Sequence, residues 1–304
     1  PKETPGLLPV GFLPCALEVD AVRQVEIVKN DPSLSDRWSA RLTSQKKERW
    51  DLSPSSGPGN LIDQVADTTY VRHLLDTLRF LRVTGVAKNS TPETYGLSPP
   101  RFVIRWGSGV STAPLQLELG ADYQEGGKTV GTFARVPADP SHVYLVDGSM
   151  LRLLEYLTHF EVLRQRTLSL VEADTIDEFE LKTRAGKKLF AQRENSGWTD
   201  ARHRPLLPSS ENVEARVQGF AHLRIQEFID DPSVTRALEQ ALQARLSATL
   251  TVKDRQGQAT EFKIGHTPDG RMIGTTSSRP GSLFVLFPGA ERFFDPTADV
   301  IRAP

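Results

Sequence analysis

Three consecutive residues with basic side chains, Arg202, His203 and Arg204, form the most concentrated basic cluster of this chain. They follow Trp198 in a stretch that we expect to be a loop. Two guanidinium groups and an imidazole at this spacing could bind an acidic protein partner or an anionic headgroup. A solvated loop without a ligand is the alternative interpretation. Arg202, His203 and Arg204 are therefore the partner-binding residues that the sequence predicts.

The histidines, the single cysteine and the glycine-rich stretches do not have the spacing of a catalytic or cofactor site. No two of the six histidines fall in a His-x-His, His-x-x-x-His or His-Glu-x-x-His pattern. Cys15 alone can form neither an internal disulfide nor a multi-cysteine metal site. Residues 126–129, Gly-Gly-Lys-Thr, end like a phosphate loop, but Asp122 stands where such a loop requires glycine. We therefore expect a hairpin turn there, and no metal, no cofactor and no catalytic residue.

Two acidic clusters could supply paired carboxylates for acid-base chemistry. One contains the acids at positions 172, 174 and 177, and the other is the pair at positions 230 and 231. Because Asp231 stands directly before Pro232 and Ser233, its carboxylate suits the N-terminal end of a helix. We interpret this second pair as a helix cap rather than as a catalytic pair.

The elements that would position these residues occur twice, because two stretches of the chain resemble each other at an offset of 145 residues. Trp50 and Trp198 precede the two copies, three residues out of register, and we expect both to lie in the core of their copy rather than on a docking surface. The shared offset favours duplication over chance similarity. The matching residues are Asp67, Leu75, Leu78, Phe80, Leu117, Leu119 and Gly120 in the first copy and Asn212, Phe220, Leu223, Ile225, Phe262, Ile264 and Gly265 in the second.

Hydrophobic periodicity predicts strands and helices in both copies. Asp67 and Asn212 are the expected N-caps of two equivalent helices. In the first copy we expect strands at 22–29, 41–45, 102–106, 115–119, 131–136 and 143–146, and a helix over 150–168 with Leu153, Leu154, Leu157, Phe160 and Leu163 on one face. In the second copy we expect hairpins at 178–192 and 250–264, a helix at 234–246 and a strand at 283–287.

The composition is that of a folded protein that is long enough for two domains. The chain has 304 residues, of which 38% are hydrophobic and 25% are charged. Its 37 basic and 38 acidic residues leave a formal charge of -1, so we expect no nucleic-acid partner. No apolar run is long enough to span a bilayer. The start at Pro1 is consistent with a missing N-terminal anchor or signal, and equally with routine trimming.

A set of short motifs runs through the chain. They are Trp50 with Leu52 and Pro54, Ala66-Asp67 followed by Val71, Leu74, Leu75 and Leu78, the turn at residues 95–100, and the segments 117–120, 132–136, 143–146 and 163–168. These motifs resemble those of the bacterial family of the domain of unknown function 4340. The resemblance runs over roughly residues 40 to 230 and continues weakly to the end. The second copy departs from it, because it lacks the Tyr-Gly-Leu-x-Pro turn and the Phe-Ala-Arg-Val strand.

This resemblance implies an extracytoplasmic domain behind an N-terminal membrane helix, often associated with gliding-motility-type or other ABC transport components. It transfers no catalytic residue. If the first copy carries a binding surface at the turn of residues 95–100 and the strand of residues 132–136, the second copy is not expected to carry one.

We therefore expect an α+β fold of two related repeats, each a small, mostly antiparallel sheet with helices packed on one face. The expected parts are an extended N-terminal arm at 1–20, the first repeat at 21–170 and the second at 171–304. The expected function is a non-enzymatic, periplasmic, membrane-tethered binding or scaffold module, accessory to an ABC-type transporter or envelope machine, with a protein partner. The alternatives are a ligand-binding or hydrolytic protein with a site in the cleft between the repeats, and a component of a homomeric assembly.

Overall fold

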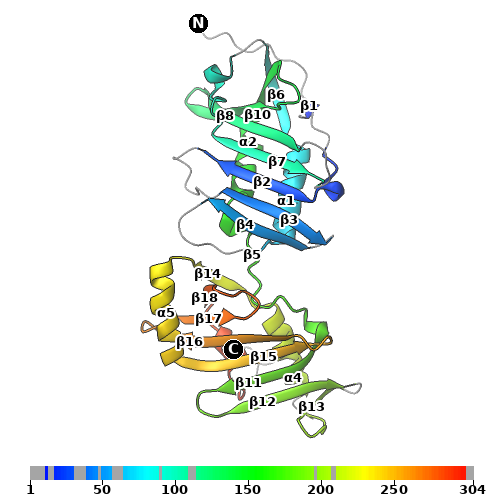
Figure 1. Cartoon of the computed structure of the whole chain (residues 1–304), viewed down its shortest axis with the longest axis vertical. Coiled ribbons are helices and arrows are strands. Elements are labelled where there is room, and N and C mark those ends of the chain that lie inside the picture. Colours follow the sequence, from blue (N-terminus) through cyan, green and yellow to red (C-terminus); the bar gives the residue numbers. More distant parts are fainter. Residues whose placement is uncertain are drawn as a thin grey trace. The chain divides into compact units, whose positions relative to one another are not determined.

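The chain divides into two compact units, unit 1 (Pro1–Gln165) and unit 2 (Arg166–Pro304), each with its own sheet (Figure 1). The computed structural model describes residues 11–12, 17–30, 39–46, 49–56, 64–88, 91–108, 114–194, 197–206 and 210–298. The sequence placed the boundary between the repeats after residue 170. Most of the expected arm at 1–20, including Cys15, lies outside the described residues.

The sheet of unit 1 is antiparallel throughout, and its strands follow the order β1-β6-β10-β9-β8-β7-β2-β3-β4-β5. The β8–β9 hairpin turns at Gly126 and Gly127, as expected from the sequence, and both glycines have the positive φ that such a turn requires. The strands are β1 (Gly11–Phe12), β2 (Gln24–Lys29), β3 (Ser39–Lys46), β4 (Arg49–Ser56), β5 (Gln64–Val65), β6 (Arg82–Lys88), β7 (Phe102–Gly107), β8 (Leu115–Glu125), β9 (Lys128–Arg135) and β10 (His142–Asp147).

Helix α1 (Thr68–Arg79) packs on one face of this sheet through a single apolar stripe. Asp67 caps it as predicted, because its carboxylate accepts hydrogen bonds from the N–H groups of Thr69 and Tyr70. The residues of the stripe are buried in one core with residues of the sheet; they are Val71, Leu74, Leu75 and Leu78.

The helix expected over 150–168 is two shorter helices, α2 (Gly148–Leu157) and α3 (Phe160–Leu163). The prediction for Leu153 was wrong, because this side chain is 46% exposed. The buried residues of α2 step by three through Leu151, Leu154 and Leu157, and this spacing turns Leu153 to the outer side of the helix.

The sheet of unit 2 is also antiparallel, with the strand order β13-β12-β11-β15-β16-β17-β18-β14. Its helices are α4 (Ser210–Ala221) and α5 (Pro232–Ala244). The strands are β11 (Ile176–Thr183), β12 (Lys188–Glu194), β13 (Gly197–Thr199), β14 (Ile225–Ile229), β15 (Leu246–Asp254), β16 (Ala259–His266), β17 (Met272–Thr276) and β18 (Leu283–Leu286).

The two sheets share one strand order. Reversed, the order in unit 2 is β14-β18-β17-β16-β15-β11-β12-β13, which corresponds strand by strand to β6-β10-β9-β8-β7-β2-β3-β4 in unit 1. Helices α1 and α4 occupy the same place in the two chain paths, between β4 and β6 and between β13 and β14. The topology of unit 2 therefore repeats that of unit 1.

The expected cap Asn212 is not a cap, because α4 already begins at Ser210. Asn212 lies in the first turn of the helix, and its Nδ2 donates to the carbonyl oxygen of Ala298 at 3.4 Å. Helix α4 starts 142 residues after α1 (210 minus 68), not 145, so the helices do not share the offset that Gly120 on β8 and Gly265 on β16 keep.

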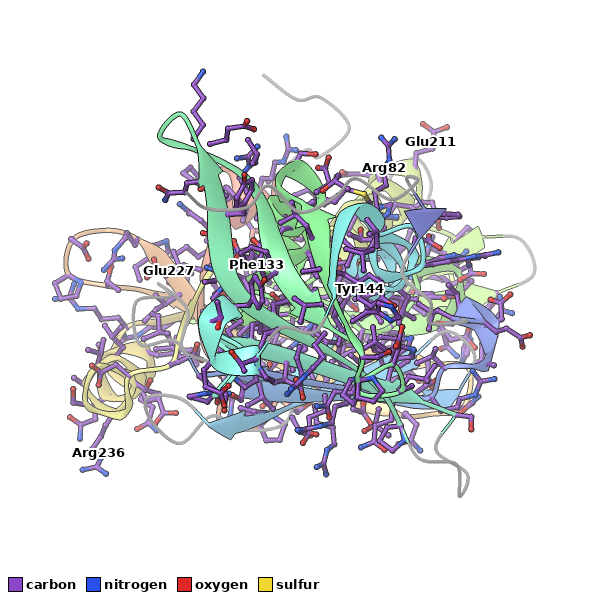
Figure 2. The ribbon with its side chains drawn as sticks, turned by 90° about the horizontal axis from the view of Figure 1, so that it is seen from above. Arg82, Phe133, Tyr144, Glu211, Glu227 and Arg236 are labelled. Carbon is purple, nitrogen blue, oxygen red and sulfur yellow. The ribbon has the colours of Figure 1, made fainter. Side chains whose placement is uncertain are left out.

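Unit 2 departs from the expected arrangement because its helices lie on both faces of the sheet. Helix α4 belongs to the larger core cluster, with Phe284 of β18. Helix α5 contributes Leu242 to a separate cluster with Ile273 of β17 and Leu283 of β18. The neighbours of these two strand residues, Met272 and Phe284, belong to the larger core, and neighbouring residues of a strand point to opposite faces of the sheet. Figure 2 shows Arg236 pointing from α5 away from unit 2.

Candidate functional site

Unit 1 contains a pocket of about 350 Å³ between α1 and the beginning of strand β2. This volume lies within the range of small-molecule sites, roughly 300–1,000 Å³. Thr68, Arg72 and Leu75 line it from one face of α1, because positions i, i+4 and i+7 lie one above the other on a helix. The other lining residues are Val19, Asp20, Val22, Arg23, Ser44 and Trp50.

Backbone hydrogen bonds fix the position of Arg23, one of the residues that line this pocket. The N–H of Arg23 donates to Gly107 O at 2.8 Å, and the N–H of Ser44 donates to Arg23 O at 2.8 Å. The guanidinium of Arg23 is fixed as well, because its Nη1 donates to the carbonyl oxygens of Asp20 at 2.7 Å and Val22 at 2.8 Å. The side of the pocket that Arg23 forms is therefore ordered by hydrogen bonds within unit 1.

A second feature of unit 1 is the outer side of α2, which carries exposed apolar side chains. Leu153 is 46% exposed and Tyr156 is 52% exposed. Residues three apart are neighbours on a helix surface, so the two side chains form one apolar strip. Large exposed aromatic and aliphatic residues that lie together are typical of protein docking surfaces.

In unit 2, the described residues after β18 contain no α-helix, and Phe287 there is 48% exposed. After β18 the described chain forms a short 3-10 turn, Ala290–Phe294, whose Phe293 and Phe294 are buried in the core of unit 2. Buried Arg216 of α4 holds this turn, because its Nη1 donates to the carbonyl oxygens of Arg292 and Phe293. The exposed strip of α2 therefore distinguishes unit 1 from unit 2.

The predicted basic site at Arg202, His203 and Arg204 lies in an ordered turn after β13. Arg204 Nε donates to Asp200 Oδ2 at 2.8 Å, and this guanidinium lowers the pKa of Asp200 to about 2. His203 has a φ of 59° and contacts Glu194 Oε1 through Nδ1 at 2.6 Å. Two of the three predicted side chains thus pair with carboxylates of unit 2 itself, and their role in binding a partner stays a prediction.

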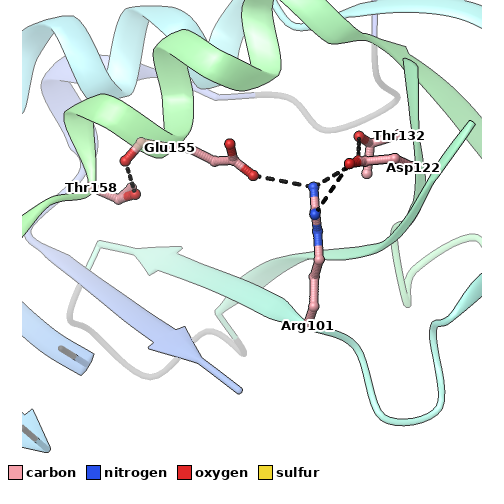
Figure 3. A network of polar contacts seen from close by, with 5 residues as sticks. All are labelled: Arg101, Asp122, Thr132, Glu155 and Thr158. Carbon is pink, nitrogen blue, oxygen red and sulfur yellow. Dashed lines mark hydrogen bonds and ion pairs between the residues drawn. The ribbon is translucent and has the colours of Figure 1, made fainter. Parts of the chain in front are cut away.

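The turn at residues 95–100 positions Arg101, which bridges two carboxylates under α2 (Figure 3). Arg101 Nη2 donates to Asp122 Oδ1 at 2.8 Å and to Glu155 Oε1 at 3.1 Å. Thr132 Oγ1 donates to the same oxygen of Asp122 at 2.6 Å. Burial raises the pKa of Glu155, the charge of Arg101 opposes this rise, and the charge of Asp122 adds to it.

This network connects strands to a helix, and we assign it a structural role. Asp122 lies on β8, Thr132 on β9 and Glu155 on α2, so the one guanidinium ties α2 to the sheet. The turn before it is itself packed: Leu97 is fully buried, and the rings of Tyr95 and Phe133 lie 4.4 Å apart.

A serine, a histidine and an aspartate meet in the turn before β10, but not with the geometry of a catalytic triad. Asp139 and Ser141 both contact the same nitrogen of His142, Nδ1, at 2.9 and 3.1 Å. In a triad the base uses one nitrogen for the nucleophile and the other for the carboxylate. Hydrogen bonds from the Tyr144 hydroxyl, from His142 and from Ser141 lower the pKa of Asp139 to about 2.

The acidic pair at positions 230 and 231 lies at the start of α5. Asp231 caps α5 as predicted, with the N–H of Ser233 donating to its carboxylate at 2.9 Å. Within the described ranges, no group of three or more His, Cys, Asp or Glu side chains could hold a metal ion. Trp50 and Trp198 are 6% and 3% exposed, which confirms their predicted place in the two cores. No helix among the described residues is long and apolar enough to cross a membrane.

Sequence reasoning missed both the pocket and the strip on α2. The pocket combines residues from Val19 to Leu75 that carry no motif, and only the folding of β2, β3, β4 and α1 brings them together. The strip had a signal, because Leu153 and Leu154 are adjacent and cannot both face the core of one amphipathic helix.

Comparison with known proteins identifies the family. A family described as "Domain of unknown function (DUF4340)" matches residues 93–244, which is half of the 304 residues and includes β7 to β10, α2 and the chain from β11 to the end of α5. No curated protein matches the chain. The match confirms the resemblance over residues 93–244, whereas the motifs at 50–54 and 66–78 lie before the matched range, and the chain belongs to the DUF4340 family of domains of unknown function.

Proposed function

We propose that this chain is a non-enzymatic binding or scaffold module of the bacterial cell envelope, and that unit 1 docks a protein partner through the outer side of α2. In this proposal the full-length protein is periplasmic, is anchored to the inner membrane, and serves an ABC-type transporter or a motility machine. The observation that carries the docking surface is the exposed strip of Leu153 and Tyr156.

The strip has the chemistry of an interface core. Leucine and tyrosine side chains that leave water on binding contribute about 25 cal/mol per Å² of apolar area, and an aromatic anchor commonly contributes about 2 kcal/mol or more to an interface. Helix α2 is also rigidly held, because Glu155 on it pairs with Arg101 of the sheet. A rigid helix lowers the conformational cost of binding.

The repeated topology supports a division of labour between the units. We infer that the units arose by duplication, because their strand orders agree. Among the described residues, β10 of unit 1 is followed by a helix that exposes Leu153 and Tyr156 side by side. In the described part of unit 2, β18 is followed instead by one exposed large hydrophobic residue, Phe287, and by a turn that buries Phe293 and Phe294. The partner surface is therefore assigned to unit 1.

The test compares partner recovery from crosslinked cells for the wild-type protein and for a Leu153→Lys, Tyr156→Lys double variant. Each substitution places a charge on an exposed position, so folding is retained while the apolar contact is lost. The matched control is Val234→Lys, at an apolar position of α5 in unit 2 that is 43% exposed. We expect an envelope protein that copurifies with the wild type and the control but not with the double variant. Equal recovery with all three proteins would contradict the proposed surface, and fractionation of the cells tests the envelope location separately.

A further inference from the structure

We infer that the pocket of unit 1 binds a small organic monocarboxylate with an apolar body, at a site separate from the strip on α2. The pocket has two cationic residues, Arg23 and Arg72, and an apolar wall that includes Trp50. This combination recognises an anionic group at one end of a ligand and a hydrophobic group at the other.

The two guanidinium groups supply the anion-binding part. Arg23 is preorganised, since its hydrogen bonds to the described residues use Nη1 alone and hold the side chain in place. Arg72 is exposed and forms no ion pair with any residue that the structure describes. Guanidinium groups bind carboxylates through paired, charge-assisted hydrogen bonds, so these two side chains provide donors for one carboxylate.

The apolar wall supplies the second part of the site. Val22, Trp50 and Leu75 line the pocket, and they are 3%, 6% and 2% exposed. Because these side chains are packed in the core of unit 1, the wall is preformed. A flat apolar group that lies against such a wall leaves water without a large cost in ordering the protein.

The charge of the lining favours a monoanion. Among the described lining residues, Arg23 and Arg72 contribute two positive charges and Asp20 contributes one negative charge, which leaves a net charge of +1. A monocarboxylate neutralises this charge, whereas a dianion would leave one negative charge in excess. The pocket is therefore expected to prefer a carboxylate over a phosphate dianion.

The test is a titration of the full chain with phenylacetate, observed through the tryptophan indole N–H signals in NMR spectra. A Trp50→Phe variant assigns the signal of Trp50, and Trp198 in unit 2 serves as the internal control. We expect the signal of Trp50 to shift saturably while that of Trp198 stays in place. Phenylacetamide, which is uncharged, and inorganic phosphate are expected to bind more weakly than phenylacetate.

Two substitutions on α1 separate the pocket from general charge effects. Arg72→Gln removes a lining cation and is expected to weaken phenylacetate binding at least about tenfold. Arg79→Gln removes a cation at the other end of the same helix, where the guanidinium lies 5.2 Å from the ring centre of Phe80, and is expected to leave binding unchanged.

A peptide that ends in phenylalanine with a free carboxylate distinguishes two sources of this chemistry. Tighter binding of this peptide than of phenylacetate assigns the site to a peptide C-terminus, and weaker binding assigns it to a free acid. The inference is overturned if neither probe shifts the signal of Trp50, if phenylacetamide or phosphate binds as tightly as phenylacetate, or if Arg72→Gln binds like the wild type.

Discussion

Arg101 illustrates how one residue stabilises unit 1. Its side chain is 20% exposed and joins the carboxylates of Asp122 and Glu155, whose side chains are 33% and 31% exposed. We expect Arg101→Met to lower the free energy of unfolding by about 1–3 kcal/mol, because two partly buried carboxylates lose their shared cation. The pKa of Glu155, already raised by burial, is expected to rise further. Urea unfolding and an NMR titration of Glu155 measure the two effects.

The matched control for Arg101 is an exposed ion pair in unit 2. Arg204 pairs with Asp200, and the side chain of Arg204 is 68% exposed. Exposed pairs contribute little to stability because water screens them, so Arg204→Met is expected to leave the free energy of unfolding nearly unchanged. An equal loss of stability in both variants would contradict the structural role of Arg101.

Asp139 is the residue whose titration tests the turn before β10. Its pKa is lowered from 3.8 to about 2, chiefly by the hydroxyl of Tyr144. A carboxylate with a depressed pKa contributes stability that is present above pH 3.8 and is lost as the pH falls toward 2. We expect Tyr144→Phe to move the pKa of Asp139 back toward 3.8 and to reduce the loss of stability in that pH range. An Asp139 pKa that stays near 2 in this variant would show that Tyr144 is not the main cause.

Among the elements, strands β8 and β16 each carry a glycine at the same place, Gly120 and Gly265, and the close approach of another backbone segment explains both. A Cβ atom on Gly120 would lie 2.2 Å from the carbonyl oxygen of Tyr95, and one on Gly265 would lie 2.7 Å from that of Arg245. In unit 1 the turn at residues 95–100, which leads into β7, lies directly over Gly120. In unit 2 the C-terminal end of helix α5, which leads into β15, lies directly over Gly265. The shared glycine is therefore a packing requirement of the repeated topology.

This close approach makes a prediction for unit 1. We expect Gly120→Ala to lower the free energy of unfolding by about 1–3 kcal/mol, because the backbone of the turn must move away from the new methyl group. Gly85→Ala on β6 is the control, since its Cβ would meet its nearest atom at an ordinary 3.6 Å. Urea unfolding of both variants decides the matter, and equal stability of the two would contradict the packing assigned to the turn.

Much of the element structure follows from local sequence signals, and the exceptions have physical reasons. Asp67 and Asp231 were predicted as caps because capping depends on neighbouring backbone atoms alone. Asn212 was wrong as a cap because it was placed by the offset of the strands, which the helices do not share. Strands β4, β6, β13, β14 and β17 were missed, because short runs with few apolar residues carry little periodic information.

The candidate sites were less predictable than the elements. Arg202, His203 and Arg204 are adjacent in sequence and were found as a basic cluster, but their pairing with Asp200 and Glu194 depends on the turn that they form. Arg23 and Arg72 are 49 residues apart (72 minus 23), and nothing local relates them. A site that is built by tertiary contacts between ordinary residues leaves no motif to read.

At the scale of the whole molecule, each unit has its own core. One cluster extends from Leu17 to Leu163, and the clusters of unit 2 extend from Leu168 to Phe294. We expect residues 1–165 and 166–304, expressed separately, each to unfold cooperatively, because each buries its own apolar faces. Calorimetry of the two fragments checks this expectation. A fragment without a cooperative transition would show that its unit needs the rest of the chain to fold.

The most direct measurement of the proposed function places a photo-crosslinking amino acid at position 153 of the full-length protein in its native host. The control carries the same amino acid at position 236, because Arg236 is exposed on α5 of unit 2. We expect illumination to crosslink position 153, and not position 236, to one envelope protein that mass spectrometry identifies. The absence of a crosslink at position 153, or the same crosslinked proteins at both positions, would contradict a docking surface on α2.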